Sequence, residues 1–288
     1  MEKIINYSIE SLKSSDTAVK EFDFFRFEYF AKDIDHLKAP HRHLFYTFIL
    51  VTDGGGSHDI DFHTHPLRPG RLFLIAPGQV HAWNELKSVK GFVALFSDSF
   101  MALSKGRKVM SAWPLFRAHQ SAYYDLTKSE QQEWINEFLF IEQEKEKNDR
   151  YSRDAIFYSI SSLMVRGTRL SVLRVDNSFS IDHGVLFKFQ ELVEKNFIKL
   201  KTPKDYALLL NITPNYLNAV CKKKSGLSAG ALIRQRIILE AKRLLAHTSL
   251  SVSEIAFKLN FEDNSYFGKV FKRSTNTTPE SFRASQLS

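Results

Sequence analysis

The fold of the last third of the chain is decided by a stretch that occurs twice, YALLLNITPNYLNAVCKKKSGLSAGAL at residues 206–232 and IAFKLNFEDNSYFGKVFKRSTNTTPESF at residues 255–282. Past a one-residue insertion the copies correspond at an offset of 50, which pairs Leu217 with Phe267 and Val220 with Val270. Apolar residues recur at helical spacing on both sides of a short polar break. Each copy is therefore predicted to form a helix, a turn and a second helix.

The residues of each turn favour this interpretation. Asn211 suits the left-handed conformation that ends a helix, and Thr213 followed by Pro214 is typical of a helix N-cap with proline at the first position. The second copy has Asn260 and a cap at Asp263. These signals predict second helices over residues 214–224 and 264–274, joined by a helix over residues 229–246 of roughly 27 Å.

The two faces of each second helix differ in kind. One face is an apolar stripe, and the other carries small, amide and basic side chains without any acid. An α-helix fits the major groove of B-DNA, where Asn can pair with adenine and Lys with guanine. The candidate base-facing residues are Asn215, Asn218, Ala219, Asn264, Ser265, Gly268 and Lys269. A helical bundle that binds only protein is the alternative.

The charge of the chain is unevenly distributed. Residues 183–288 contain 17 Lys and Arg against 8 Asp and Glu, a net charge of +9, whereas residues 1–182 have a net charge of −1. This asymmetry favours a neutral module joined to one that meets a polyanion, although a solvated basic surface would have the same composition. The candidate phosphate contacts, towards the ends of the second helices, are Lys222, Lys223, Lys224, Lys272 and Arg273.

The N-terminal part has the pattern of a β domain. Apolar runs at residues 22–30, 44–52, 72–76 and 92–97 alternate with turn signals at residues 39–40, 53–56, 68–70 and 77–78. Amphipathic helical patterns follow at residues 129–141 and 154–169, whose apolar faces either pack against the β domain or form a dimer interface. The segment SVLRVDNSFSID at residues 171–182 is interpreted as a linker.

Composition narrows the class of protein. No apolar run approaches the ~18 residues of a membrane-spanning helix, and the first twenty residues lack the apolar centre of a signal peptide, so we expect a cytoplasmic protein without a membrane partner. The single cysteine, Cys221, excludes an internal disulfide and a zinc site built on cysteine pairs.

Residues 183–288 resemble the DNA-binding domain of AraC/XylS-type bacterial transcription regulators, which have two helix-turn-helix motifs joined by a long helix. The pieces that carry the resemblance are IAFKLNF, SYFGKVFKR, TPESFR and RQRIILEAKRLLAHTSLSVSEIA. By this resemblance the seven candidate residues match base-facing positions of the family. Asn260 and Asn276 stand where the family has Gly, and Ala229 where it often has Pro; because Asn tolerates the left-handed conformation, we expect both turns to form.

The runs APHRHLFYTFILVTDGGGSHDIDF, LRPGRLFLIAPGQVHAW and GFVALFSDSF resemble the cupin-like N-terminal domain of AraC-type regulators. Metal-binding cupins use a His-x-His pair, a Glu and a later His, and here His41, His43 and His81 are the alternative metal ligands. The Glu is absent after His43. No catalytic constellation is evident, so we expect neither an enzyme nor a cofactor. The aromatic residues of this domain either line an effector pocket or form an ordinary core.

We therefore expect an α+β multidomain protein. Its predicted parts are a cupin-like antiparallel β-barrel sensor (residues 1–115), a helical dimerisation or packing segment (116–170), a linker (171–182) and an all-α double helix-turn-helix domain (183–288). The expected function is sequence-specific binding of double-stranded DNA by a homodimeric transcription activator that contacts RNA polymerase, with or without a small-molecule effector. A cupin metalloenzyme with a DNA-binding appendage is the competing class.

Overall fold

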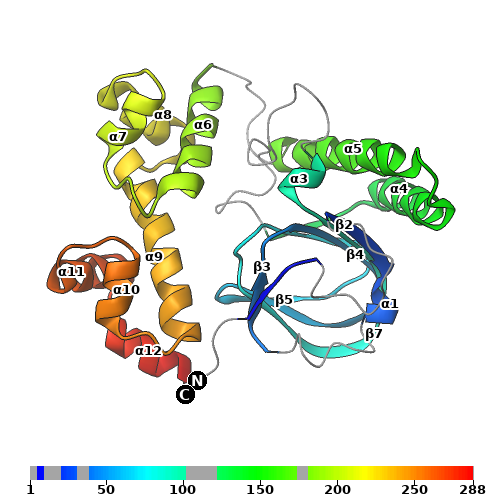
Figure 1. Ribbon diagram of the computed structural model, residues 1–288, viewed down its shortest axis with the longest axis horizontal. Helices are drawn as coiled ribbons and strands as arrows, with labels where there is room; N and C mark the ends of the chain where they lie inside the picture. The colour runs from blue at the N-terminus through cyan, green and yellow to red at the C-terminus, as the bar shows by residue number, and fades with distance from the viewer. Residues whose placement is uncertain (1–4, 10–20, 31–38, 102–121, 174–180, 288) are drawn as a thin grey trace. The chain divides into compact units, whose positions relative to one another are not determined.

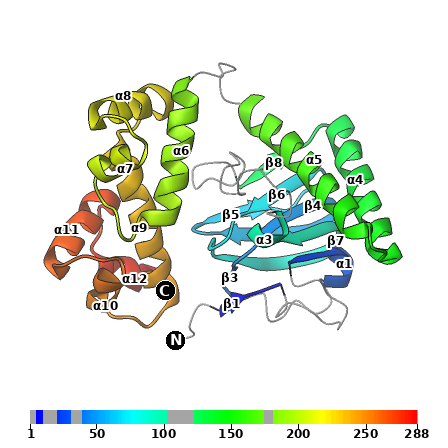
Figure 2. The same cartoon turned by 45° about the horizontal axis from the view of Figure 1, so that its top comes forward.

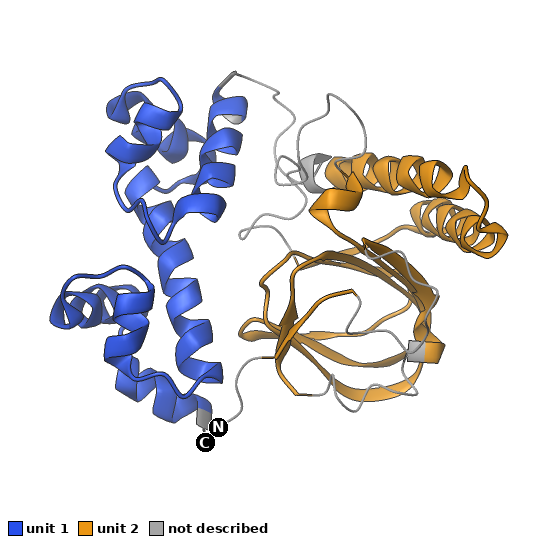
Figure 3. Ribbon diagram, in the orientation of Figure 1, with its two compact units in different colours: residues 1–4, 178–288 blue, residues 5–177 orange. Residues whose placement is uncertain are grey.

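The computed structural model describes residues 5–9, 21–30, 39–101, 122–173 and 181–287. The chain divides into two compact units, Ile5–Asn177 and Ser178–Ser288, with residues 1–4 assigned to the second (Figure 3). The described part of the first unit contains strands and helices, and that of the second only helices. None of the helices in the described residues combines the length and hydropathy needed to cross a bilayer.

The first unit is built on one strongly curled sheet (Figures 1 and 2). Its strands are β1 (Ile5–Tyr7), β2 (Phe22–Arg26), β3 (His41–His43), β4 (Tyr46–Ile60), β5 (His63–Pro66), β6 (Arg71–Ile75), β7 (His81–Phe96) and β8 (Tyr123–Asp125). The strand order is β1-β3-β7-β4-β6-β8, with β2 also on β7 and β5 on β4. Every pairing is antiparallel except that of β1 with β3. The predicted barrel-like β domain is therefore confirmed.

The two faces of the sheet bury separate apolar cores, because successive side chains of a strand point to opposite faces. Ile49, Phe73 and Val93 belong to the inner core. The outer face is covered by α4 (Lys128–Lys147) and α5 (Ser152–Leu173). The Trp134 ring lies 5.4 Å from that of Phe48, measured between centroids. Of the two alternatives for the helix pair, packing against the β domain is thus confirmed for these faces.

The glycine run at residues 53–56 corrects one prediction. It was predicted to be a turn, but it lies inside β4, where the register with β7 shifts three times between Val51 and Ser57. Gly54 has φ 87°, and a Cβ there would stand 2.5 Å from the backbone oxygen of Ser88. The glycines therefore allow a bulged strand to approach its partner closely, and they do not end the strand.

Two predicted segments have different bounds in the structure. The strand predicted at residues 22–30 ends at Arg26, and Phe27–Phe30 form the short helix α1, in which Phe27 turns inward against Trp83 with ring centroids 5.0 Å apart. Helix α5 continues to Leu173, because neither Pro nor Gly interrupts residues 168–173, and α6 begins at Ile181. Helical residues thus extend into the predicted linker from both ends, and residues 174–180 lie outside the described part.

The second unit is a set of helices around one long helix, α9 (Ala229–His247), which was predicted at residues 229–246. The others are α6 (Ile181–Asn196), α7 (Pro203–Leu209), α8 (Pro214–Ser225), α10 (Val252–Lys258), α11 (Asn264–Thr275) and α12 (Pro279–Leu287). Helices α7 and α8 lie near one end of α9, and α10 and α11 lie nearer the other (Figures 1 and 2). All contribute to one apolar core.

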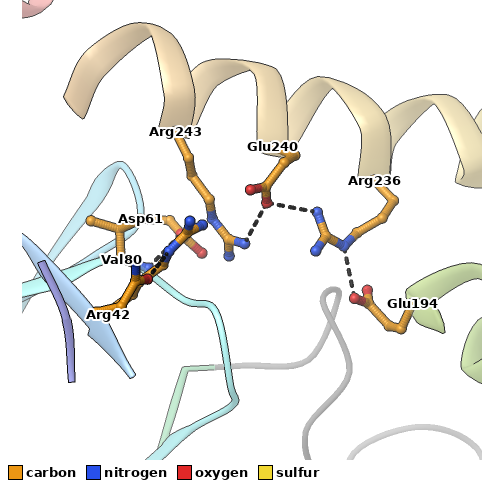
Figure 4. A network of polar contacts seen from close by, with 8 residues as sticks. Arg42, Asp61, Val80, Glu194, Arg236, Glu240 and Arg243 are labelled. Atoms are coloured by element: carbon orange, nitrogen blue, oxygen red, sulfur yellow. Dashed lines mark hydrogen bonds and ion pairs between the residues drawn. The ribbon is translucent and has the colours of Figure 1, made fainter. Parts of the chain in front are cut away.

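A chain of ion pairs also ties α6 to α9 (Figure 4). Arg236 donates from Nε to Glu194 at 2.7 Å and from its terminal nitrogen to Glu240 at 3.3 Å, and Arg243 donates to the same Glu240 oxygen at 3.3 Å. Arg236 also lies over the Phe197 ring, 3.9 Å from its centroid. These contacts fix the long helix on which both helix pairs are mounted.

Candidate nucleic-acid interface

The first helix pair, α7 and α8, is joined by a tight turn. Asn211 has φ 53°, the predicted left-handed conformation, and the next N–H, of Ile212, donates to the Ala207 oxygen at 3.0 Å. The Thr213 side chain accepts from Tyr216 N–H, and Pro214 is the first residue of α8. The predicted N-cap is therefore confirmed, and α8 runs to Ser225.

The second helix pair, α10 and α11, repeats this geometry. Asn260 has φ 59°, and the N–H of Phe261 donates to the Ala256 oxygen at 2.9 Å. The Asp263 carboxylate accepts from the N–H groups of Ser265 and Tyr266 at 2.8 and 3.1 Å. Asn276, with φ 62°, ends α11 as Gly226, with φ 73°, ends α8. The asparagines thus adopt the left-handed conformation expected of them.

Both second helices bury the predicted apolar stripe. Leu217, Val220 and Cys221 on α8 are buried, as are Phe267 and Phe271 on α11, whereas Val270 is half-buried. Burial raises the pKa of Cys221 to about 12, so its thiol stays protonated and acts as a small apolar side chain.

The opposite faces carry most of the candidate base-facing residues. Asn215 and Ala219 on α8 are exposed, and so are Asn264, Ser265 and Lys269 on α11, whereas Asn218 and Gly268 are half-buried. Nothing lies within 4 Å of where a Cβ of Gly268 would stand, so this face of α11 is open. Neither α8 nor α11 contains an acidic residue.

Asn218 has a partner that the sequence did not reveal. Its carboxamide oxygen accepts a hydrogen bond from the Ala229 N–H, at the start of α9, with an N–O distance of 3.0 Å. A two-bond contact with adenine uses both the oxygen and the nitrogen of an Asn side chain. In this conformation one of the two lone pairs of the Asn218 oxygen is therefore already engaged.

The candidate phosphate contacts lie where they were expected, in the last turns of α8 and α11. Lys222, Lys223, Lys272 and Arg273 are exposed and Lys224 is half-buried. Lys223 donates to Asp182 of α6 with an N–O distance of 2.9 Å, and the Tyr216 hydroxyl donates to the other oxygen of that carboxylate at 3.0 Å. These two hydrogen bonds hold the pKa of Asp182 below its usual value.

Tyr216 and Tyr266 were missed as candidates. They are 40% and 59% exposed, each in the first turn of its second helix. Their hydroxyl groups suit phosphate oxygens and their rings suit thymine methyl groups. The signal was in the sequence, since the offset of 50 places the same residue at the same position of both copies.

The alternative metal ligands come together inside the β domain without converging on a point. The rings of His41 and His43 lie 4.3 and 4.8 Å from the His81 ring between centroids, and all three are buried. His43 has Nδ1 2.7 Å from the Phe45 oxygen and Nε2 3.3 Å from the Thr47 hydroxyl, so both its nitrogens are engaged. Across the described residues no group of three His, Cys, Asp or Glu side chains is arranged to hold a metal ion.

A hydrogen bond joins two imidazoles of the β domain, those of His58 and His81. His58 Nε2 and His81 Nδ1 are 2.8 Å apart, and His58 stacks on Trp83 with ring centroids 3.8 Å apart. Burial lowers the pKa of both imidazoles well below 6.5, which keeps them neutral. Their outer nitrogens, His58 Nδ1 and His81 Nε2, are buried without a hydrogen-bond partner among the described residues.

The arrangement defines a class of protein: a helix-turn-helix DNA-binding unit joined to a separate curled β domain. Two parts of the chain match the profiles of known domains. Residues 206–285 match the profile of a helix-turn-helix domain, and residues 26–84 match that of the AraC-like ligand binding domain.

Relatives that are similar over most of the chain are named as helix-turn-helix transcriptional activators. The HTH-type transcriptional activator RhaR of Mannheimia succiniciproducens is 21% identical over 86% of this chain and 89% of its own length. RhaR of Enterobacter sp. is 23% identical over 85% and 86%. These similarities support a DNA-binding transcription regulator, whose N-terminal part matches the AraC-like ligand binding domain and whose C-terminal part matches a helix-turn-helix domain.

Solved structures that resemble the chain include the C-terminal domain of the response regulator yesN from Fusobacterium nucleatum. It is 28% identical, covers 35% of this chain and 98% of that one, and has a TM-score of 0.33. ToxT from Vibrio cholerae is 14% identical, covers 91% of each chain and has a TM-score of 0.40.

Proposed function

We propose that the protein is a sequence-specific transcription activator that acts in the cytoplasm, and that α8 and α11 each read bases in a major groove. One observation carries the proposal: α8 and α11, the second helices of two similar helix-turn-helix pairs, each have an exposed face without an acidic residue, and α9 connects the two pairs. With 19 residues α9 is about 28 Å long, close to the ~34 Å turn of B-DNA. The two RhaR relatives are named transcriptional activators, which supports activation and a contact with RNA polymerase.

The proposed contacts divide into two kinds. Base contacts come from α8 and α11, through Asn215, Ala219, Asn264, Ser265, Gly268 and Lys269, with Asn218 contributing its Nδ2 group and the remaining lone pair of its oxygen. Phosphate contacts come from Lys222, Lys223, Lys224, Lys272 and Arg273. Their position in the last turns supports that role, as does the exposure of all but the half-buried Lys224. The Tyr216 and Tyr266 hydroxyl groups join the second kind.

An effector in the β domain is part of the proposal, and the His58–His81 pair supports it. One nitrogen of the joined pair must donate and the other accept, so the two outer nitrogens always offer one N–H and one lone pair. A buried polar group without a partner destabilises a fold by about 1–3 kcal/mol, so a ligand that bonds both is favoured. Because both rings are neutral, the effector is an uncharged molecule with hydroxyl groups, which both donate and accept.

We also propose that two copies of the chain form a homodimer through α4 and α5. The predicted domain boundaries at residues 115, 170 and 182, which place this helix pair in a segment of its own, are kept as part of the proposal. Tyr158 and Val165 are exposed on α5 and lie seven residues apart, so they share a face that the β domain does not cover. A molar mass that falls to that of a monomer when both are replaced by Ser would support this interface, and an unchanged mass would exclude it.

Selection from random DNA duplexes tests the DNA-binding proposal. At moderate salt the full-length protein should enrich two short sequence blocks about one helical turn apart, as two reading helices on one chain require. No enriched sequence at a salt concentration where non-specific binding is weak would contradict the proposal.

A further inference from the structure

Lys201 belongs to one helix pair by its backbone and contacts the other by its side chain. It directly precedes Thr202, the N-cap of α7, yet its ammonium group donates to the backbone oxygen of Leu259, the residue that ends α10. The same nitrogen lies 3.9 Å from the centroid of the Phe261 ring, in the turn between α10 and α11. This one side chain therefore bridges the first pair, α7 and α8, to the second, α10 and α11.

The backbone on both sides of Lys201 is held firmly to the first pair. The Leu200 oxygen accepts from the hydroxyl of Tyr206, a fully buried residue of α7, at 2.9 Å. Thr202 is the N-cap of α7, and its side chain and that of Asp205 form a reciprocal capping box. The base of the lysine side chain is thus fixed relative to α7 and α8.

The far end of the contact leads to the second reading helix. The N–H of Phe261 is bonded to Ala256 of α10 at 2.9 Å, which fixes the turn. The Phe261 ring lies 5.2 Å from the ring of Phe267 and 6.1 Å from that of Tyr266, both on α11. A continuous line of contacts therefore runs from the start of α7 to α11 without passing through α9.

Two further observations set Lys201 apart from a solvated surface lysine. Burial lowers its pKa to about 8, because its ammonium group is drawn out of water against the second pair. The residue at the corresponding position of the second copy, counted at an offset of 49 before the insertion, is Leu250. The lysine is therefore not part of the repeated unit and belongs to the junction between its two copies.

We propose that Lys201 is a positioning residue that fixes the angle between the two helix pairs, and with it the separation of the two DNA blocks that α8 and α11 bind. Helix α9 limits the distance between the pairs, and the charged hydrogen bond and the cation–π contact of Lys201 limit how each turns on that helix. This inference rests on the proposed function.

The test uses the full-length protein and the bipartite DNA site that it selects. Affinity is measured for that site, for the same site with one base pair inserted or deleted between its blocks, and for each block alone. One base pair changes the separation by about 3.4 Å and the angle by about 34°. The proteins compared are the wild type, K201M, K201R and K204M, the last of which removes the same charge from an exposed position of α7.

The wild type, K201R and K204M should lose at least tenfold in affinity on either change of spacing, whereas K201M should lose less than about threefold while binding single blocks as the wild type does. Equal spacing preference in K201M and the wild type would overturn the inference and leave the proposed function standing. A wild type that selects no bipartite site would overturn both. If K201M folds poorly, F261I, with the residue of the first copy at that position, must relax the spacing preference instead; retention of the preference in F261I would also overturn the inference.

Discussion

The carboxamide oxygen of Asn218 accepts a hydrogen bond from the backbone N–H of Ala229, 3.0 Å away, and the second copy of the repeat lacks both partners. At the corresponding positions it has Gly268, without a side chain, and Pro279, without an N–H. The first N–H groups of a helix have no partner within the helix, and proline at the first position removes one of them. Asn218 thus supplies an acceptor for the first N–H of α9, whereas α12 needs no such acceptor because Pro279 has no N–H.

This relationship predicts a coupled pair of substitutions. Asn218→Ala should lower the free energy of unfolding of the helical unit by about 1 kcal/mol, because it leaves the Ala229 N–H unpaired. In an Ala229→Pro background the same substitution should cost little. Proline is compatible with this site, since Ser228 before it is extended, with φ −69° and ψ 156°. Urea unfolding followed by far-ultraviolet circular dichroism measures the cycle, with N215A as the exposed control; equal costs in both backgrounds would refute the coupling.

A second prediction concerns Asp182, whose carboxylate accepts from both Lys223 and Tyr216. DNA phosphates must compete with this carboxylate for the lysine. Asp182→Asn should therefore raise the affinity for DNA about two- to tenfold at low salt and steepen its dependence on salt by up to about one counterion. Titrations of a labelled duplex at several salt concentrations measure both effects.

The control for Asp182 is Glu280→Gln, which removes one negative charge from an exposed position of α12. It should change affinity less than Asp182→Asn does, because within the described part of the chain no hydrogen bond or ion pair joins Glu280 to a candidate phosphate-binding side chain. Equal gains from the two substitutions would indicate a general effect of net charge and would contradict a competition at Lys223.

The local parts of this architecture could be predicted from sequence, and the long-range parts could not. Asn211, Asn260 and Asn276 were expected to be left-handed because that preference belongs to the residue and its helix end, and all three are. The bond from Asn218 to Ala229 and the reach of Lys201 to Leu259 join residues distant in sequence. Helical periodicity and capping patterns describe one element at a time and do not reveal such contacts.

The glycine run at residues 53–56 is a case in which the local pattern predicted the wrong structure, a turn in place of a bulged strand. Consecutive glycines are typical of turns, and nothing in the run itself tells a turn from a bulge in a long strand. Only the neighbouring strand distinguishes them, since Gly54 faces the backbone of Ser88 and Val89 on β7. For the interface, the repeat offset is sufficient to identify Tyr216 and Tyr266, because it places the same residue at the same position of both copies.

The same glycines give a third prediction. Gly54→Ala should lower the free energy of unfolding of the β domain by about 2–4 kcal/mol, because of its positive φ and the close backbone of β7. Gly55→Ala is the matched control, since nothing lies within 4 Å of its Cβ position. The three tryptophans, at positions 83, 113 and 134, all lie in the first unit, so their fluorescence reports its unfolding. Equal losses for the two variants would contradict the bulge account.

A fourth prediction is acid sensitivity of the β domain. Burial lowers the pKa of His43 to about 3 and that of His58 and His81 well below 6.5. Between these values and ~6.5 the unfolded chain binds protons that the folded domain does not, so stability is present above ~6.5 and is lost as the pH falls. Each imidazole contributes at most about 1.4 kcal/mol per pH unit.

Tryptophan fluorescence during thermal unfolding at pH 7.5, 6.5 and 5.5 measures this effect. The midpoint should fall steadily towards pH 5.5, and His81→Gln should reduce the fall. His63→Gln, at an exposed position of β5, should leave it as in the wild type. A midpoint that does not change with pH in the wild type would show that these imidazoles do not resist protonation.

The central claim is that α8 and α11 each read their own block of DNA. Selection from random duplexes, repeated with Asn215→Ala and with Lys269→Ala, tests it most directly. Each substitution should relax the base preference in one block only, a different block for each, at a cost of about 1–3 kcal/mol for the wild-type site. Loss of preference across both blocks from either substitution, or an enriched motif unchanged by both, would contradict the claim.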